Sequence, residues 1–350
     1  MTLTSRERVR RTLRFATPDR VPRCLGTLPW AHQRYPEVIQ QLRARFPDDL
    51  GGVPSVYRPS PRAHGDWYAV GQYTDEWGCV FENIQAGVHG EVREPIIKEL
   101  EEWHRMQPPY EILPEDWAAA RETVNRACAA SPLFLWAACC PRPWERYQFL
   151  RGTANAMLDM MDFPIAAQRL LRAIHDFYLK ECEFWMRTDV DALFFMDDWG
   201  SQRQLLLPPQ LWRAIFKPLY RDYCAFAHAH GKFALMHSDG YILEILEDLI
   251  EIGVDAINAQ IFCMDLAELG RRFKGRITFM GEIDRQHVLT APDPEVGRRA
   301  VRTVAQHLYD PRGGVIAHFE FGPGAQPDTV LVIFEEWQRL DEAAHAGAPG

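Results

Sequence analysis

The chain has 350 residues, of which 47% are hydrophobic and 25% are charged, an ordinary composition for a globular enzyme. Its formal net charge of −9 argues against a general role in binding nucleic acid or membrane surfaces, because such roles need basic patches. No signal peptide and no apolar run of about eighteen residues is recognisable. We therefore expect a cytoplasmic protein whose eight cysteines, none in CxxC spacing, are reduced.

The first hundred residues predict two helices, one strand and an irregular insertion. The helices are expected at Ser5–Phe15 and Pro36–Phe46, and the strand at Val21–Gly26. The segment 51–65 is rich in Pro and Gly, and the segment 68–97 alternates short β-like runs with glycine turns. We expect residues 51–100 to form an antiparallel excursion that covers the mouth of the fold.

Strands and helices alternate regularly in the remainder. Strands are predicted at Leu133–Ala138, Ala192–Met196, Phe233–Met236, Ala256–Ala259, Ile277–Met280 and Gly314–Phe319. Helices are predicted at Glu115–Ala130, Trp144–Met160, Ile165–Met186, Pro209–His230, Tyr241–Ile252, Met264–Phe273, Pro294–Leu308 and Thr329–Ala344. About seven or eight such strand–helix units favour one α/β domain over residues 1–350, a (β/α)8 TIM barrel. No P-loop and no GxGxxG segment opens a helix, so no nucleotide cofactor is expected.

Two predicted strands end in polar clusters. Asp197 and Asp198 follow Ala192–Met196, and His237, Ser238 and Asp239 follow Phe233–Met236. The carboxyl ends of parallel strands are where α/β folds place their chemistry, so Asp197, Asp198, His237 and Asp239 are candidate catalytic residues. The alternative is that they cap the following helices. Because adjacent residues on a strand point to opposite faces, only one aspartate of the first pair is expected to face the interior.

Other polar and aromatic residues are candidates for substrate contact. Arg203 suits a substrate carboxylate, which it can bind through two hydrogen bonds. The remaining candidates for substrate binding are Gln202, Tyr241, Arg58, Trp144 and Glu282. The alternative for the loop residues among them is an ordinary exposed position.

The chain resembles the uroporphyrinogen decarboxylase superfamily, which also contains corrinoid-linked methyltransferases. The segments that carry this resemblance are SRERVRRTLRFATPDRVPR, MDDWGSQRQLLLPPQLWRAIFKPLYRDY, HAHGKFALMHSDGYILEILEDLIEIGVDAINA, GEIDRQHVL and FEFGPGAQPDTV. The resemblance extends over nearly the whole chain. It implies a (β/α)8 barrel with its site at the carboxyl ends of the strands.

The sequence departs from the superfamily pattern in both branches. The arginine-rich loop of the decarboxylases is replaced by CLGTLPWAHQRYP, which argues against a porphyrinogen substrate. The zinc-binding HxC motif of the methyltransferases reads His237-Ser238-Asp239 here, and no cysteine follows the last strand. His237, Asp239 and Glu320 remain as candidate ligands, with Glu282 and His318 as substitutes. One imidazole and two carboxylates suit Zn²⁺, Mn²⁺ or Fe²⁺. The alternative is a metal-free site.

Three functions are weighed. The first is a decarboxylase, a carbon–carbon lyase acting on a carboxylated small molecule. The second is a methyl- or alkyl-transfer enzyme of the O-demethylase type, with a corrinoid protein as partner. The third is a non-catalytic ligand-binding barrel. A homodimer is expected, and no nucleic acid or membrane partner.

Overall fold

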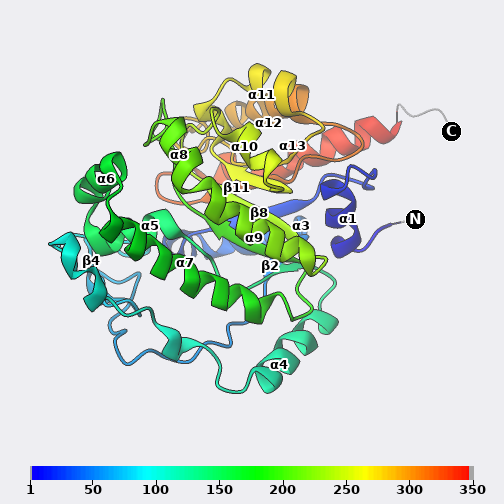
Figure 1. Ribbon diagram of the computed structural model, residues 1–350. Helices are drawn as coiled ribbons and strands as arrows, with labels where there is room; N and C mark the ends of the chain where they lie inside the picture. The colour runs from blue at the N-terminus through cyan, green and yellow to red at the C-terminus, as the bar shows by residue number, and fades with distance from the viewer. Residues whose placement is uncertain (1, 347–350) are drawn as a thin grey trace.

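The fold is built on parallel β-strands in a computed structural model that describes residues 2–346 (Figure 1). A six-stranded parallel sheet has the order β10-β9-β8-β7-β6-β2, and β1 pairs in parallel with β11. These strands are β1 Arg23–Thr27, β2 Leu50–Gly52, β6 Phe134–Trp136, β7 Ala192–Met196, β8 Phe233–Ser238, β9 Ala256–Ala259, β10 Thr278–Gly281 and β11 Ala317–Phe321. The prediction of an α/β fold with a parallel sheet is confirmed.

Hydrogen bonds link the pair β1–β11 to the larger sheet at both edges. On one side, parallel bridges join Phe279 to Val315 and Glu282 to His318. On the other, the Asp49 backbone N–H donates to the Arg23 carbonyl oxygen at 2.8 Å. The two edges of the larger sheet therefore both lie against the β1–β11 pair.

Helices follow most of the parallel strands. Their bounds are α1 Ser5–Leu13, α2 Pro29–Arg34, α3 Pro36–Arg45, α4 Trp117–Ala130, α5 Pro143–Arg151, α6 Thr153–Asp162, α7 Ile165–Trp185, α8 Pro209–Ile215, α9 Lys217–Ala229, α10 Leu246–Glu251, α11 Leu266–Phe273, α12 Pro294–Leu308 and α13 Pro327–Ala346. The helix predicted from Trp144 is interrupted at Gly152, whose φ of 79° is outside the helical region. The helix predicted at Pro209–His230 divides at Phe216, before Pro218, because proline cannot donate the hydrogen bond that would continue it. Residues 1 and 347–350 of the predicted 1–350 domain lie outside the described residues.

The insertion contains a small antiparallel sheet, as the glycine-rich turns predict. It consists of β3 Gly71–Thr74, β4 Val80–Asn83 and β5 Glu91–Val92 in the order β3-β4-β5. Two short 3₁₀ helices, η1 Leu100–Arg105 and η2 Tyr110–Ile112, follow it, and a third, η3 Ile261–Cys263, follows β9. In Figure 1 the strand β4 lies at the periphery, near α5 and α6. The described helices include none long and apolar enough to cross a bilayer.

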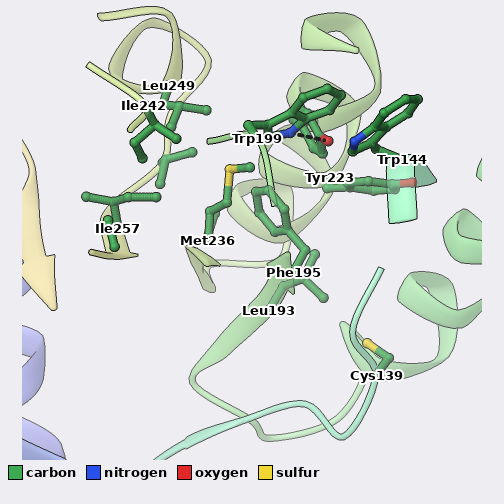
Figure 2. Packing of buried hydrophobic residues seen from close by; sticks show 14 of the residues in the cluster. Cys139, Trp144, Leu193, Phe195, Trp199, Tyr223, Met236, Ile242, Leu249 and Ile257 are labelled. Carbon is green, nitrogen blue, oxygen red and sulfur yellow. Dashed lines mark hydrogen bonds between the residues drawn. The ribbon is translucent and has the colours of Figure 1, made fainter. Parts of the chain in front are cut away.

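Side chains alternate between two apolar layers along each parallel strand. Leu193 and Phe195 of β7 and Met236 of β8 belong to the large cluster that packs against the helices, and Tyr223 of α9 lies beside Phe195 (Figure 2). The residues between them face the opposite way. The second cluster contains Val9, Leu13, Cys24, Leu50, Phe134, Ala192, Phe233, Leu235, Ala256, Met280 and Ile316. It therefore collects side chains from seven of the parallel strands and from Ile316, the residue before β11, with Val9 and Leu13 of α1 at its amino-terminal end.

Candidate active site

The second apolar cluster continues toward the carboxyl ends of the strands as a polar one. A period of two residues leads from Leu235 to His237 in β8 and on to Asp239, directly after the strand. The same period leads from Ala256 to Asn258 in β9 and from Met280 to Glu282 after β10. It also leads from Ile316 to His318 and Glu320 in β11. The pleat of the strands thus places these polar side chains on the face that carries the second apolar cluster.

Asp198, His237 and Asp239 form the centre of this polar group. The His237 Nε2 atom lies 3.5 Å from one carboxylate oxygen of Asp198 and 3.5 Å from one of Asp239. One ligand atom from each residue lies within 4.8 Å of the others, a spacing that could hold a metal ion. Burial lowers the pKa of His237, but the hydrogen bond with Asp198 and the charges of the nearby carboxylates outweigh this and raise it to about 10. Burial raises the pKa of Asp198, but His237 more than offsets it, so the pKa is lowered.

Asn258 fixes the orientation of the His237 ring. Its Nδ2 atom donates to the Met280 carbonyl oxygen at 2.8 Å, so its other amide atom is the oxygen, an acceptor. This Oδ1 lies 2.7 Å from His237 Nδ1, which must therefore carry a proton and donate. The Nε2 atom is left to face the two aspartates, either protonated or as a ligand, an arrangement typical of metal-binding histidines.

Arg285 connects the carboxylates around this centre. It pairs with Asp239, and its Nη1 atom lies 2.9 Å from Glu320 Oε1 and 4.0 Å from Glu282 Oε2. Burial lowers the pKa of Arg285, but the charges of Asp239, Glu282 and Glu320 outweigh it and raise the pKa above its usual value. Burial is also the main cause that raises the pKa of Glu282 and of Glu320. The acidic side chains of this group outnumber its basic ones, His237 and Arg285.

Two glycines bring the loops after β7 and β8 into backbone contact. A Cβ atom on Gly240 would lie 2.2 Å from the Gly200 carbonyl oxygen, and Gly240 has a φ of 77°. Gly200 N–H donates to the Asp239 carbonyl oxygen at 3.0 Å, and the Asp239 N–H donates to Asp198 Oδ1 at 2.9 Å. Only glycine permits so close an approach. The pair therefore holds Asp198 beside Asp239.

A cavity of about 1010 Å³ opens over this centre. Asp198, His237, Asp239, Arg285 and Glu320 line one part of it. The remainder is lined by the insertion and by α5 and α7, with many aromatic side chains: Tyr57, Trp67, Tyr68, Tyr73, Trp77, Phe81, Phe149, Phe177 and Tyr178. The insertion and the helices α5 and α7 thus both contribute aromatic rings to the cavity over the polar centre.

A second polar group lines the same cavity. Arg142, at the start of α5, is 28% exposed at its side chain, and its Nη1 atom lies 3.9 Å from Glu145 Oε2. Burial raises the pKa of Glu145; the Arg142 charge opposes this, and the Asp198 charge adds to it. The Glu145 Oε2 atom is buried and has no hydrogen-bond partner among the described residues. Burial also raises the pKa of Glu181, on α7, to about 8.

The structure separates the two adjacent aspartates. Asp197 is fully buried on the helix side of the sheet, where its carboxylate accepts hydrogen bonds from the backbone N–H groups of Trp144 and Glu145 at 2.9 and 2.7 Å. The Tyr220 hydroxyl donates to it at 2.6 Å. Asp197 does not line the cavity. It caps the first turn of α5, a helix that precedes it in the chain, and not the following helix that the capping alternative named. Only Asp198 of the pair reaches the polar centre.

The other predicted substrate-binding residues are dispersed. Arg58 lines the cavity, where it pairs with Glu115, and Glu282 lies buried beside Arg285. Gln202 lines a small adjoining pocket, whereas Arg203 is exposed. Trp144 and Tyr241 were predicted to contact the substrate, but their side chains do not line the cavity. Trp144 is fully buried and stacks on Trp199 at 5.3 Å, and Tyr241 lies among Glu244, Glu268 and Arg272 outside the cavity.

Sequence reasoning did not identify Asn258, Arg285, Arg142 or Glu181. The signal for Asn258 is present, because it stands two residues after the inward-facing Ala256 of a predicted strand. Arg285 follows β10 in a loop, and nothing local indicates that its side chain reaches Asp239 directly after β8.

A divalent cation fits the residues that surround His237. The Asp239 Oδ1 atom is buried and accepts no hydrogen bond from the residues that the structure describes. An imidazole nitrogen and two carboxylate oxygens are ligands that Zn²⁺, Mn²⁺ and Fe²⁺ accept. Asp198 takes the third position next to His237 and Asp239, whereas Glu320, predicted for that position, pairs with Arg285.

Comparisons with known proteins agree with this fold. The geometry defines a barrel-related α/β protein with a polar centre at its strand ends. The family model for uroporphyrinogen decarboxylase (URO-D) matches residues 76–340, more than half of the chain, and the chain belongs to this family. No curated protein matches the sequence.

Solved structures add evidence on the fold. A methyltransferase from Methanosarcina mazei aligns with 97% of this chain and 99% of its own at a TM-score of 0.67 and 14% identity, which shows a shared fold. A dihydropteroate synthase from Xanthomonas albilineans aligns with 57% of this chain and 64% of its own at 14% identity. Its TM-score of 0.29 is too low to carry an argument.

Proposed function

We propose that this chain is a metal-dependent decarboxylase that acts on a small carboxylated substrate. The observation that carries the proposal is the arrangement of Asp198, His237 and Asp239 at the base of the cavity, with Nε2 of the histidine directed at both carboxylates. A divalent metal bound by these three residues would be a Lewis acid that withdraws electrons from a substrate oxygen.

Arg142 is the candidate for binding the substrate carboxylate. Its guanidinium is partly exposed to the cavity, and its nearest acidic partner is 3.9 Å away, in contrast to Arg285, which Asp239 and Glu320 already occupy. A guanidinium can bind a carboxylate through two parallel hydrogen bonds. The surrounding aromatic rings desolvate the bound carboxylate, which favours its loss as neutral CO2.

Glu145 is the candidate for the proton donor. When the carbon–carbon bond to the carboxylate breaks, its electron pair remains on the substrate carbon, which then takes up one proton. Burial raises the pKa of Glu145 and keeps its carboxyl group protonated at higher pH than usual, so it can supply this proton. The overall change is loss of CO2 and gain of a proton, without oxidation or reduction.

We also propose that the eight parallel strands form one closed (β/α)8 barrel. Support comes from the bridges that join the segments of β10 and β11, from the hydrogen bond between Asp49 and Arg23, and from the second apolar cluster, to which seven strands and Ile316 before β11 contribute. A cytoplasmic location is consistent with the eight free cysteines.

Metal binding gives the first test of the decarboxylase proposal. The protein, purified without chelator, is titrated with Mn²⁺ and Zn²⁺ and its bound metal is counted by mass spectrometry. We expect one site in the wild type and none in His237→Ala. Equal metal binding by both proteins would overturn the assignment.

Carbon dioxide release from a panel of aromatic and 3-oxo carboxylic acids gives the second test. We expect Glu145→Gln to lower kcat and Arg142→Gln to raise KM, whereas Arg299→Gln, an exposed control on α12, should behave as the wild type. Turnover that is unchanged in Glu145→Gln would remove the assigned proton donor.

A second candidate function is methyl or alkyl transfer with a corrinoid partner. It is favoured by the likeness to the Methanosarcina mazei methyltransferase over almost the full length of both chains. The same metal site could activate a methyl ether oxygen as a leaving group. Methylation of added cob(I)alamin by aromatic methyl ethers, with no CO2 released from the acid panel, would favour this function over decarboxylation.

A further inference from the structure

A second cavity, of about 540 Å³, lies at the opposite end of the strands. Its lining includes Asp191, which precedes β7, and Lys232 and Phe233 at the start of β8. The polar centre around His237 is at the other end of these same strands. The two cavities therefore share no lining residue and can be tested separately.

Helix α1 supplies three arginines to this cavity. Arg6, Arg10 and Arg14 are spaced four residues apart, so one face of the helix and its C-terminal end present all three. With Lys232 they make four cationic side chains, against the two carboxylates of Asp189 and Asp191. The lining thus carries an excess of positive charge in a chain whose net charge is −9.

Two of these cations have a structural role. Arg6 Nε lies 3.1 Å from Asp191 Oδ2, and the same guanidinium donates to the carbonyl oxygens of Leu133 and Cys128. Arg10 Nη2 lies 2.7 Å from Asp191 Oδ1. Together they neutralise Asp191 and attach α1 to the start of β7, which accounts for both without any ligand.

The other two cations lack an acidic partner. Neither Arg14 nor Lys232 forms an ion pair or a side-chain hydrogen bond with any residue between 2 and 346. The Arg14 guanidinium lies over the Phe233 ring, 5.2 Å from its centroid. Burial lowers the pKa of Lys232, and the Arg10 charge adds to this effect, although Asp189 and Asp191 oppose it. A half-buried lysine beside other cations is stabilised by an added anion.

From the unpaired Arg14 and Lys232 and the charge excess around them, we propose that this cavity binds a phosphate-bearing small molecule. A phosphate monoester carries about two negative charges at neutral pH, which matches the excess of two cations in the lining. Arginine and lysine are the side chains that bind phosphate oxygens most strongly, and a site of this volume admits a group larger than phosphate alone.

Isothermal titration calorimetry with inorganic phosphate and with pyrophosphate, at an ionic strength held constant with NaCl, tests the proposal. We expect saturable binding of pyrophosphate with one site per chain, and a loss of affinity of about tenfold in Lys232→Gln and in Arg14→Gln, the effect of removing one charged hydrogen bond. Lys274→Gln, an exposed lysine at the end of α11, should bind as the wild type. Thermal melting of each variant checks that it is folded.

Three results would overturn the proposal. The first is wild-type binding of pyrophosphate no stronger than that of chloride. The second is unchanged affinity in both Lys232→Gln and Arg14→Gln, together with a loss in Arg142→Gln, which would place the anion in the cavity above His237. The third is stronger binding of citrate than of either phosphate compound, which would assign the site to carboxylates.

Discussion

Glu181 provides a test of how strongly the cavity wall excludes water. This glutamate on α7 is 5% exposed, and burial raises its pKa from 4.5 to about 8, although the hydrogen bond with Tyr57 opposes the rise. The folded protein holds this proton more tightly than the unfolded chain does. The contribution of the protonated Glu181 to the free energy of unfolding is therefore fully present below pH 4.5, and it is lost as the pH rises to about 8.

The substitution Glu181→Gln removes this titration and keeps the shape of the side chain. Each pKa unit corresponds to about 1.4 kcal/mol, so the wild type should lose about 2 kcal/mol between pH 6.5 and pH 9 relative to the variant. Urea denaturation of both proteins over this pH range measures the difference. The glutamine amide adds an offset that does not change with pH, so the slope is the decisive quantity. Parallel stability curves for the two proteins would refute the account of Glu181.

Three further changes test the framework of the site. Asp197→Asn places an amide NH2 among three donors and should destabilise the fold by about 2 kcal/mol in urea while the number of bound metal ions stays at the wild-type value. Asn258→Leu frees the His237 ring and should weaken Mn²⁺ binding about 10- to 100-fold in a calorimetric titration; wild-type affinity would contradict the role of the asparagine. Gly240→Ala forces a Cβ atom into backbone and should lower thermal stability far more than Gly231→Ala, which has a similar φ of 68° but open space around it; equal losses would show that the contact can relax.

Much of the fold could be predicted from the sequence, because apolar runs bounded by turns mark buried parallel strands. Strand β2 was not recognised, since its three residues include Gly51 and Gly52 and give no apolar run. The helix expected from Tyr241 to Ile252 begins only at Leu246. Gly240 packs the start of that segment against the loop after β7. This contact between the two loops sets the backbone conformation of the residues before Leu246, so they do not form a helix.

The candidate site could be predicted only as far as local periodicity reaches. Alternation along β8 put His237 and Asp239 on one face, and alternation along β7 predicted that only one of Asp197 and Asp198 would face inward. It could not predict that Asp198 would replace Glu320 next to His237. Glu320 pairs with Arg285, a side chain from a loop after β10 that also pairs with Asp239, and no local pattern predicts this contact.

The charge balance of the polar centre explains why oxygen ligands would suit a cation here. Burial raises the pKa of Glu282 and of Glu320 and leaves those carboxyl groups easier to protonate, whereas His237 lowers the pKa of Asp198 and favours its charged form. A metal ion must displace the Nε2 proton of His237, because the Nδ1 proton is held by Asn258. It then adds a net positive charge beside two carboxyl groups that can ionise in response. A divalent cation at this site would therefore displace the Nε2 proton of His237 and a second proton from one of these carboxyl groups, which keeps the net charge of the cluster unchanged.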